Sequence, residues 1–241
     1  MTDGVRQYPL IEVIAEFHFL PEVWVDDLPD ILYEELKGDL PVRKAVDRFE
    51  FEAKIEPGAG THTQSSTKIV RHQFFTSHET KLVQIDKQLL AVNHVRPYTS
   101  WEEYFPLIAT TLEAFHSVRP AAEFGKAVLQ YINRIEIAGE AVDIDDYFEF
   151  RPRFDGEFLN CGCMAVQPWA EQASVVQRVM QTQPGTDGCL PVTLVLNAQR
   201  GHTDLDQAKD WLEAAHLKLN QLFRESITDR TRDIYANRKE D

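Results

Sequence analysis

The chain has 241 residues, of which 43% are hydrophobic and 27% are charged, which is ordinary globular usage for one large domain or two closely packed halves. The formal net charge of −14 argues against non-specific binding to nucleic acid or to an anionic membrane, because both need a positive field. This charge leaves room for a local basic patch or for a basic protein partner.

The sequence favours a cytoplasmic protein. Three cysteines, an odd number, do not make a disulfide framework and point to a reducing compartment. Residues 1–9 lack the basic stretch followed by an apolar one that a signal peptide needs. No segment approaches the roughly 20 apolar residues of a membrane span.

Strand patterns dominate the first half. Residues 48–56 alternate strictly between polar and apolar side chains, and residues 11–19 are apolar at every odd position; both patterns predict half-buried strands of an antiparallel sheet. Further strands are expected at residues 68–77, 81–86 and 88–95. Residues 57–60, rich in glycine, and the Thr/Ser run after them predict a loop.

Helices are predicted at two places in this half. Residues 24–37 read as a short helix that stops at Gly38. A longer helix begins at Ser100, where Ser100 and Glu103 have the spacing of a capping box. Its apolar stripe consists of Trp101, Phe105, Ile108, Leu112 and Phe115.

The second half repeats this order. A strand over residues 127–137, a short helix near 145–148, strands at 158–166, 173–182 and 190–196, and a long helix capped at Thr203 or Asp204 are expected. A turn at residues 185–188 and a frayed tail at 230–241 complete the chain. The prediction is an α+β protein: a largely antiparallel sheet with two long amphipathic helices, made by duplication of a β-α-β-β-β-α unit. Residues 1–120 and 121–241 are the two halves, packed as one compact unit.

The cysteine and histidine patterns give little support for a metal site. Cys161 and Cys163 would share one face of a strand, but structural zinc needs a second ligand pair. Small cysteines packed on a sheet are the better interpretation. The remaining candidates are His62, His72 and His78, which fall in one β-rich region and are better explained as sheet-face or surface residues.

Carboxylates and arginines also have structural explanations. The acidic clusters at residues 143–146 and 204–206 lie at predicted helix starts, where aspartate caps exposed amides. Arg134, Arg151 and Arg153 would form a basic spot near aromatic residues, but salt bridges are favoured at this net charge. Nucleophile elbows, P-loops and dinucleotide fingerprints are absent. No catalytic residue, metal or cofactor is therefore assigned.

Polar residues that interrupt strands are the best candidates for a ligand site. Asn133 falls on the apolar face of its strand, next to Arg134, and Asn93 and Asn197 each end a strand that precedes a long helix. A buried amide that lacks partners costs about 1–3 kcal/mol, so structural hydrogen bonding is the leading explanation and a shared polar site the alternative. The predicted ligand-binding residues are Asn93, Tyr98, Trp101, Tyr131, Asn133, Arg134 and Asn197.

Several of these segments resemble a known family. The segments are residues 9–13, 92–101, 131–135, 215–216 and 223–229. In this order they resemble a sporadically distributed bacterial family of similar length with no assigned activity; the match covers nearly the whole chain. His94 and Val95 depart from the middle motif. The resemblance implies an accessory gene of a mobile or defence locus and supplies no catalytic residues.

Three functions follow from these observations. The leading hypothesis is a non-enzymatic protein-interaction or regulatory module of a bacterial accessory locus, defence or toxin–antitoxin-like, whose acidic surface steers another bacterial protein, for example a basic one. The alternative is a small-ligand or nucleotide sensor with a cavity between sheet and helices. The second alternative is a metal-dependent hydrolase.

Overall fold

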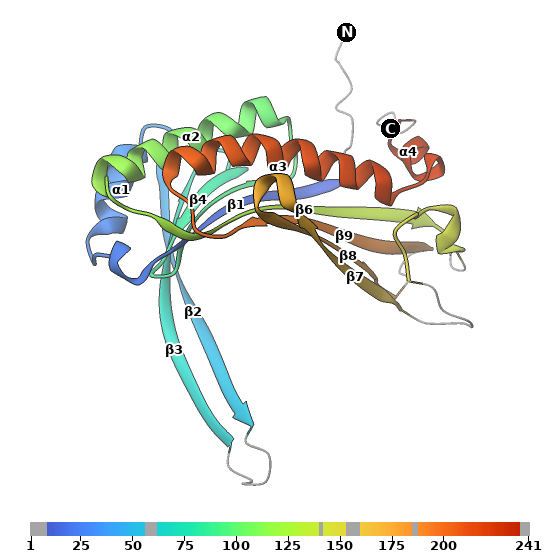
Figure 1. Ribbon diagram of the computed structural model, residues 1–241, viewed down its shortest axis with the longest axis horizontal. Coiled ribbons are helices and arrows are strands. Elements are labelled where there is room, and N and C mark those ends of the chain that lie inside the picture. Colours follow the sequence, from blue (N-terminus) through green and yellow to red (C-terminus); the bar gives the residue numbers. More distant parts are fainter. Residues whose placement is uncertain (1–8, 56–61, 140–141, 153–159, 185–187, 237–241) are drawn as a thin grey trace.

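The computed structural model describes residues 9–55, 62–139, 142–152, 160–184 and 188–236 (Figure 1). The side chains of residues 48–55 and 62–69 are not described. The predicted loop at residues 57–60 lies outside the described residues, as does most of the predicted turn at 185–188. In the part of the chain that is described, no helix is long and apolar enough to cross a membrane.

The described strands form one nine-stranded sheet of order β2-β3-β4-β5-β1-β6-β9-β8-β7, and every neighbouring pair is antiparallel. The strands are β1 (Leu10–Phe19), β2 (Val42–Ile55), β3 (His62–Phe75), β4 (Lys81–Ile85), β5 (Leu89–Val95), β6 (Phe124–Ala138), β7 (Gly162–Trp169), β8 (Ser174–Thr182) and β9 (Cys189–Arg200). The helices are α1 (Leu28–Leu36), α2 (Trp101–Val118), α3 (Leu205–Ser226) and α4 (Asp229–Ala236), with 3-10 turns at Pro21–Val23, Ile144–Asp146 and Ala170–Gln172. The predicted α+β class with an antiparallel sheet is confirmed.

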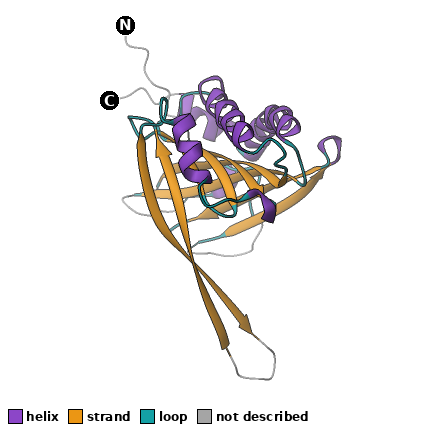
Figure 2. Ribbon diagram, turned by 90° about the vertical axis from the view of Figure 1, so that its left-hand side faces the viewer, coloured by secondary structure: helices purple, strands orange, loops and turns teal. Residues whose placement is uncertain are grey.

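The two faces of the sheet differ in what covers them. Helices α2 and α3 lie side by side over one face (Figures 1 and 2). Val13, Ala15 and Phe17 of β1 point into this layer and are fully buried, whereas the residues between them are partly exposed. Directly opposed residues of antiparallel strands share a face, so the strand registers extend this division across the sheet. We call the covered side the helix face and the other side the open face.

Both long helices begin where the sequence predicted. The Ser100 hydroxyl accepts the Glu103 N–H at 3.2 Å, and the Asp204 carboxylate accepts the Gln207 N–H at 2.8 Å. Each cap satisfies an amide that the first turn of a helix leaves free. The buried stripe of α2 includes Tyr104, which the sequence analysis missed. A single cluster of buried hydrophobic residues joins the two helices to the helix face.

Several boundaries differ from the prediction. Asn93 and Asn197 were expected to end their strands, but β5 continues to Val95 and β9 to Arg200. The helix expected at residues 24–37 begins only at Leu28, because Pro29 suits a first helical turn. The one expected near residues 145–148 is the single 3-10 turn Ile144–Asp146. The Thr/Ser run after residue 61 belongs to β3, where it pairs with β2. Residues 229–236 form α4 instead of a frayed tail, held by the buried Thr231, whose hydroxyl donates to the Tyr147 carbonyl at 2.6 Å.

A two-stranded ribbon leaves the body of the sheet. β3 pairs with β4 only from His72 to Phe75, whereas β2 and β3 pair with each other along their whole length. Figures 1 and 2 show the ribbon projecting away from the helices. The strand predicted at residues 48–56 therefore exists, but it runs in this ribbon and not in the middle of a sheet.

Candidate functional site

The seven residues predicted to bind a ligand lie on two sides of the sheet. Tyr131 is opposed by Val13, which places it and Asn133 on the helix face. Asn93 is opposed by Ile14, and Asn197 by Gln130, which places both on the open face. Arg134 lies on the open face with Glu136, to which its guanidinium donates at 3.2 Å. Tyr98 and Trp101, before and at the start of α2, belong to the helix side.

On the helix side, Trp101 and Tyr131 meet His216 of α3. The Trp101 and His216 rings are stacked, with centroids 4.3 Å apart and planes 10° from parallel. The Tyr131 hydroxyl lies 2.5 Å from Nδ1 of His216, and the Trp101 indole N–H donates to Glu213 at 2.9 Å. Burial lowers the pKa of His216, against the effect of the Glu213 and Glu102 carboxylates. These contacts bind α2, α3 and β6 to one another.

His94 is a buried titratable group of this cluster. Its side chain is 1% exposed and lies against the rings of Tyr98 and Tyr104, with centroids 4.9 and 5.7 Å away. Burial lowers the pKa of His94 to about 4, and the nearby Lys81 acts in the same direction. Its Nδ1 has no hydrogen-bond partner among the described residues. The ring is therefore neutral at pH 7 and packs as an aromatic residue.

Two further polar side chains of the helix face, those of Tyr104 and Asn133, form internal hydrogen bonds. The Tyr104 hydroxyl donates to the Val92 carbonyl at 2.6 Å and accepts the Ala15 N–H at 3.2 Å. The buried Asn133 donates to the Leu194 carbonyl at 3.1 Å. This is the structural hydrogen bonding that the sequence analysis favoured for Asn133. The helix side of the predicted site thus joins sheet and helices by packing and hydrogen bonds.

Amide side chains form a hydrogen-bonded chain on the open face. Gln73 donates to Gln84 at 2.8 Å, Gln84 donates to Asn93 at 2.9 Å, and Asn93 donates to the Glu12 carboxylate at 2.7 Å. The chain crosses β3, β4, β5 and β1. The Gln84 and Asn93 amides each accept one hydrogen bond and donate another, and the Glu12 carboxylate accepts the last one. These bonds fix the side chains relative to one another.

Asn197 lies on the other side of the central strands β1 and β6 from Asn93. It lies on β9, next to the central strand β6, as Asn93 lies on β5 next to β1. Its amide donates to Gln177 of β8 at 3.5 Å, and Gln177 reaches the sulfur of Met164 on β7 at 2.8 Å. Oδ1 of Asn197 is buried and has no partner among the described residues. Asn93 and Asn197, two of the three asparagines predicted as site residues, therefore belong to amide rows on the open face.

An apolar row runs beside these amides. Ile132 of β6 is opposed by Val195 of β9, which is opposed by Val179 of β8, and Val179 is opposed by Met164 of β7. The Met164 side chain is 65% exposed, and the nearby Val166 is 57% exposed. Large hydrophobic side chains at such exposure mark interaction surfaces when they adjoin one another.

Several charged side chains near the open face lie beside groups of opposite charge or hydrogen-bond to them. Glu16 and His18 lie 2.9 Å apart, and the hydrogen bond from His18 lowers the pKa of Glu16. Ion pairs near this face include Arg71–Asp86, Arg134–Glu136 and Lys44–Glu79. The carboxylates beside these cations reduce the attraction that the face offers to phosphate groups.

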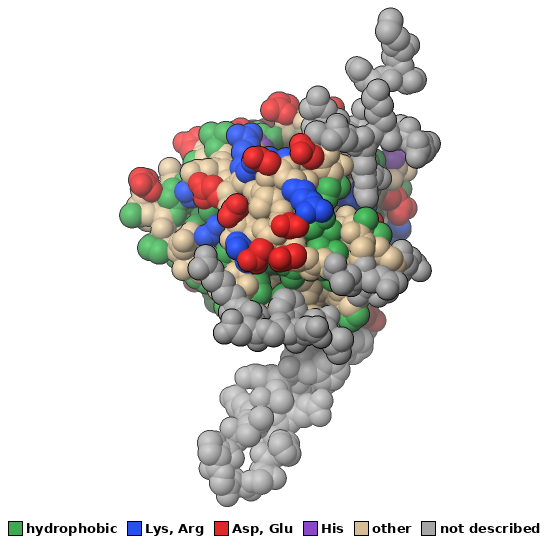
Figure 3. Space-filling view, turned by 90° about the vertical axis from the view of Figure 1, so that its right-hand side faces the viewer, with side chains coloured by type: hydrophobic (Ala, Val, Ile, Leu, Met, Phe, Trp, Pro, Cys, Tyr) green, Lys and Arg blue, Asp and Glu red, His purple; other side chains and the backbone are tan. Residues whose placement is uncertain are grey.

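The acidic and basic clusters seen in the sequence are paired as well. Asp143 caps the 3-10 turn by accepting the Asp145 N–H at 3.0 Å, Asp145 pairs with Arg151, and Asp146 pairs with Arg230 at 2.5 Å. Acidic and basic side chains are intermixed on the end of the molecule shown in Figure 3. Among the described residues, no three His, Cys, Asp or Glu side chains are grouped as metal ligands. Arg153 and the His62 side chain lie outside the described part.

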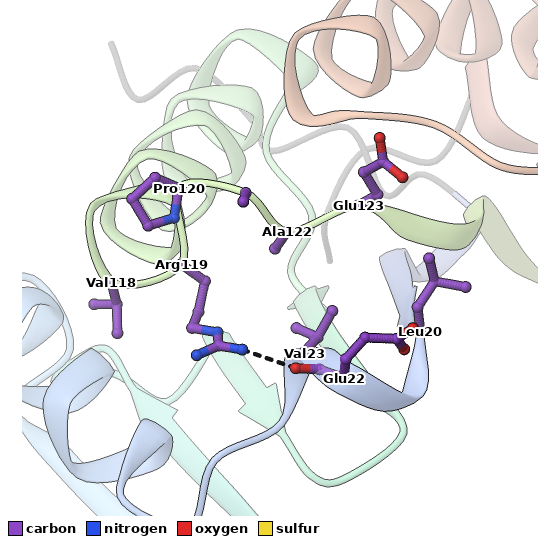
Figure 4. Close-up of a pocket in the computed structure, with 9 residues that line it drawn as sticks. Leu20, Glu22, Val23, Val118, Arg119, Pro120, Ala122 and Glu123 are labelled. Atoms are coloured by element: carbon purple, nitrogen blue, oxygen red, sulfur yellow. Dashed lines mark hydrogen bonds between the residues drawn. The ribbon is translucent and has the colours of Figure 1, made fainter.

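A surface pocket lies apart from all the predicted residues. It has a volume of about 440 Å³ and lies between the 3-10 turn Pro21–Val23 and the connection from α2 to β6. Figure 4 shows Arg119 in this pocket donating to the Glu22 carbonyl, at 2.8 Å. This hydrogen bond ties the connection between α2 and β6 to the 3-10 turn. The pocket has no further cation among its described lining residues.

Comparison with models of protein families and with curated proteins found no match. The geometry alone therefore defines the candidate site, which is the open face with its amide and apolar rows. Sequence reasoning found Asn93, Arg134 and Asn197 of this face but missed Ile132, Val179, Val195 and Met164. Alternation within each strand indicates which of its residues share a face. The register that aligns these residues across four strands depends on pairing between segments far apart in the sequence, which local patterns do not show.

Proposed function

We propose that this protein is a non-enzymatic interaction module that binds another protein through the open face of its sheet. The observation that carries the proposal is the uncovered face itself. It presents a row of directly opposed apolar residues, Ile132, Val195, Val179 and Met164, beside a row of amides. Apolar area for burial and a rim of fixed hydrogen-bonding groups are the two components of a protein–protein interface.

Charge supports a protein partner over a nucleic acid. Near the open face, Arg71, Arg134 and Lys44 are paired with carboxylates, and the whole chain carries −14. Such a field accelerates encounter with a basic protein and repels phosphate backbones. The resemblance to a bacterial accessory family agrees with a partner protein encoded nearby.

We further propose that the two halves arose by duplication. Outward from the central pair, the first half has the order β1, β5, β4, β3 and the second has β6, β9, β8, β7. In chain order, the strands of each series are followed by a helix that a side chain caps, α2 in the first and α3 in the second. β2 is an addition to the first series. The amides of Asn93 and Asn197 then stand at equivalent positions of the open face.

The proposal is tested by comparing variants of two surfaces in pull-downs from an extract of the native host. Gln130→Lys with Val179→Lys places two charges on the open face. Leu217→Lys is the matched control, because Leu217 is 68% exposed on α3, on the opposite side of the molecule. We expect the double variant to reduce recovery of a stoichiometric partner by at least about tenfold, with the control unchanged. Equal recovery with both variants would refute the assignment of the open face.

A further inference from the structure

The two outer strands of the sheet differ in how they are protected. β2 and β7 are the edges. Half of the fourteen residues of β2 are charged, whereas none of the eight residues of β7, Gly-Cys-Met-Ala-Val-Gln-Pro-Trp, is charged. Charged side chains are the usual means by which natural edge strands avoid pairing with other chains. β2 has this protection and β7 lacks it.

The hydrogen bonds to β8 determine which backbone groups of β7 point outward. The Thr182 N–H donates to the Cys161 carbonyl at 2.9 Å, so residues 161, 163, 165, 167 and 169 direct their backbone groups towards β8. Gly162, Met164 and Val166 then direct their N–H and C=O groups away from the sheet. Pro168 fits this alternation of inward and outward backbone groups. Proline has no N–H, and it is tolerated at a position where that group would face outward.

The side chains of the same residues are exposed on the open face. Met164 and Val166 are 65% and 57% exposed. In a hydrogen-bonded antiparallel pair, the opposing residue places its side chain on the same face. A strand added to β7 would therefore set every second side chain directly beside Met164 and Val166. Those side chains must be apolar if the contact is to bury apolar surface.

We propose that β7 is a docking edge, to which an extended, basic segment of the partner protein adds as a further strand with apolar residues at alternate positions. This inference rests on the proposed function and specifies the partner's chemistry. The main-chain groups of Gly162, Met164 and Val166 supply the hydrogen bonds, and the side chains of Met164 and Val166 select the apolar residues, as in other cases of strand addition. A basic segment is favoured over a second copy, because two chains of charge −14 repel each other.

The test uses a synthetic peptide of about eight residues in which valine alternates with lysine. Binding is followed by NMR titration up to about 1 mM, together with amide hydrogen exchange. We expect binding, with new protection of the Met164 and Val166 amides and none of the Cys163 and Ala165 amides, which already bond to β8. A peptide of the same composition with its valines grouped at one end should bind more weakly.

Substitutions at the edge provide the matched variants. Met164→Asp should weaken binding by at least about tenfold, although its new charge attracts the basic peptide, because a carboxylate is poorly accommodated beside an apolar strand residue. Val166→Asp gives a second, independent variant. Val46→Asp adds the same charge at the exposed position Val46 of the other edge strand, β2, and should leave affinity unchanged.

Each remaining outcome overturns the inference. No binding of the alternating peptide at the highest concentration would exclude β7 as a docking edge. Binding that protects other amides, or that persists in Met164→Asp, would place the contact elsewhere on the open face. A dimer in light scattering that Met164→Asp abolishes would make a second copy the occupant. None of these results bears on the pull-down with Gln130→Lys and Val179→Lys, so the inference and the proposed function fail separately.

Discussion

Acid should destabilise the fold through the buried His94. Its pKa is about 4 in the folded protein, against 6.5 for an ordinary histidine. The unfolded chain therefore takes up a proton near pH 6.5 while the folded protein stays neutral, so the free energy of unfolding falls as the pH drops from 6.5 towards 4 and levels off below that. At about 1.4 kcal/mol for each pKa unit, the loss amounts to about 3 kcal/mol.

Urea unfolding between about pH 7.5 and pH 4.5 measures this effect. Because carboxylates also titrate at the acidic end, the informative quantity is the difference between the wild-type protein and His94→Phe. Phenylalanine keeps the aromatic contacts with Tyr98 and Tyr104 and cannot be protonated. The wild-type protein should lose stability relative to the variant by about 2.5 kcal/mol over this range, since pH 4.5 is still above the folded pKa.

The matched control is His78→Phe, at an exposed position in the turn between β3 and β4. Its difference from the wild-type protein should stay constant with pH. If the difference between wild-type and His94→Phe were also constant, the reasoning from burial to a neutral His94 would be refuted.

Three further substitutions test hydrogen bonds that the structure assigns, each by urea unfolding. Asn93→Ala should lower the free energy of unfolding by about 1–3 kcal/mol, because two partners lose their bonds; Asn197→Ala should cost less, since its Oδ1 has no partner among the described residues, and equal costs would contradict the amide chain. Tyr104→Phe should cost about 1–3 kcal/mol by leaving a buried carbonyl unpaired, and an unchanged stability would count against that bond. Thr231→Val should cost about 1 kcal/mol by releasing α4 from the Tyr147 carbonyl; no change would mean that α4 is held by other contacts.

Local patterns predicted most of the secondary structure, because alternation and capping residues act within a few positions. The caps at Ser100 and Asp204 show this directly. Predictions failed where a distant contact decides the outcome. α4 exists because Thr231 bonds to a residue on another segment, at Tyr147, and the Thr/Ser run after residue 61 is extended because β2 pairs with it.

The candidate site was harder to predict for the same reason. Asn93, Asn133 and Asn197 were recognised as polar interruptions, but the face of each depends on its register with a neighbouring strand. Asn133 differs from the other two by lying on the helix face, where it bonds to Leu194. His216, the partner of Tyr131 and Trp101, comes from a helix far along the chain.

The most direct test of partner binding through the open face is hydroxyl-radical footprinting of the protein with and without its recovered partner. Labelling of Ile132, Val179 and Met164 reports on the open face, and that of Leu217 on the helix layer. We predict that the partner protects the first three residues and leaves Leu217 unchanged. Protection of Leu217, with Ile132, Val179 and Met164 labelled as in the free protein, would contradict the proposed function.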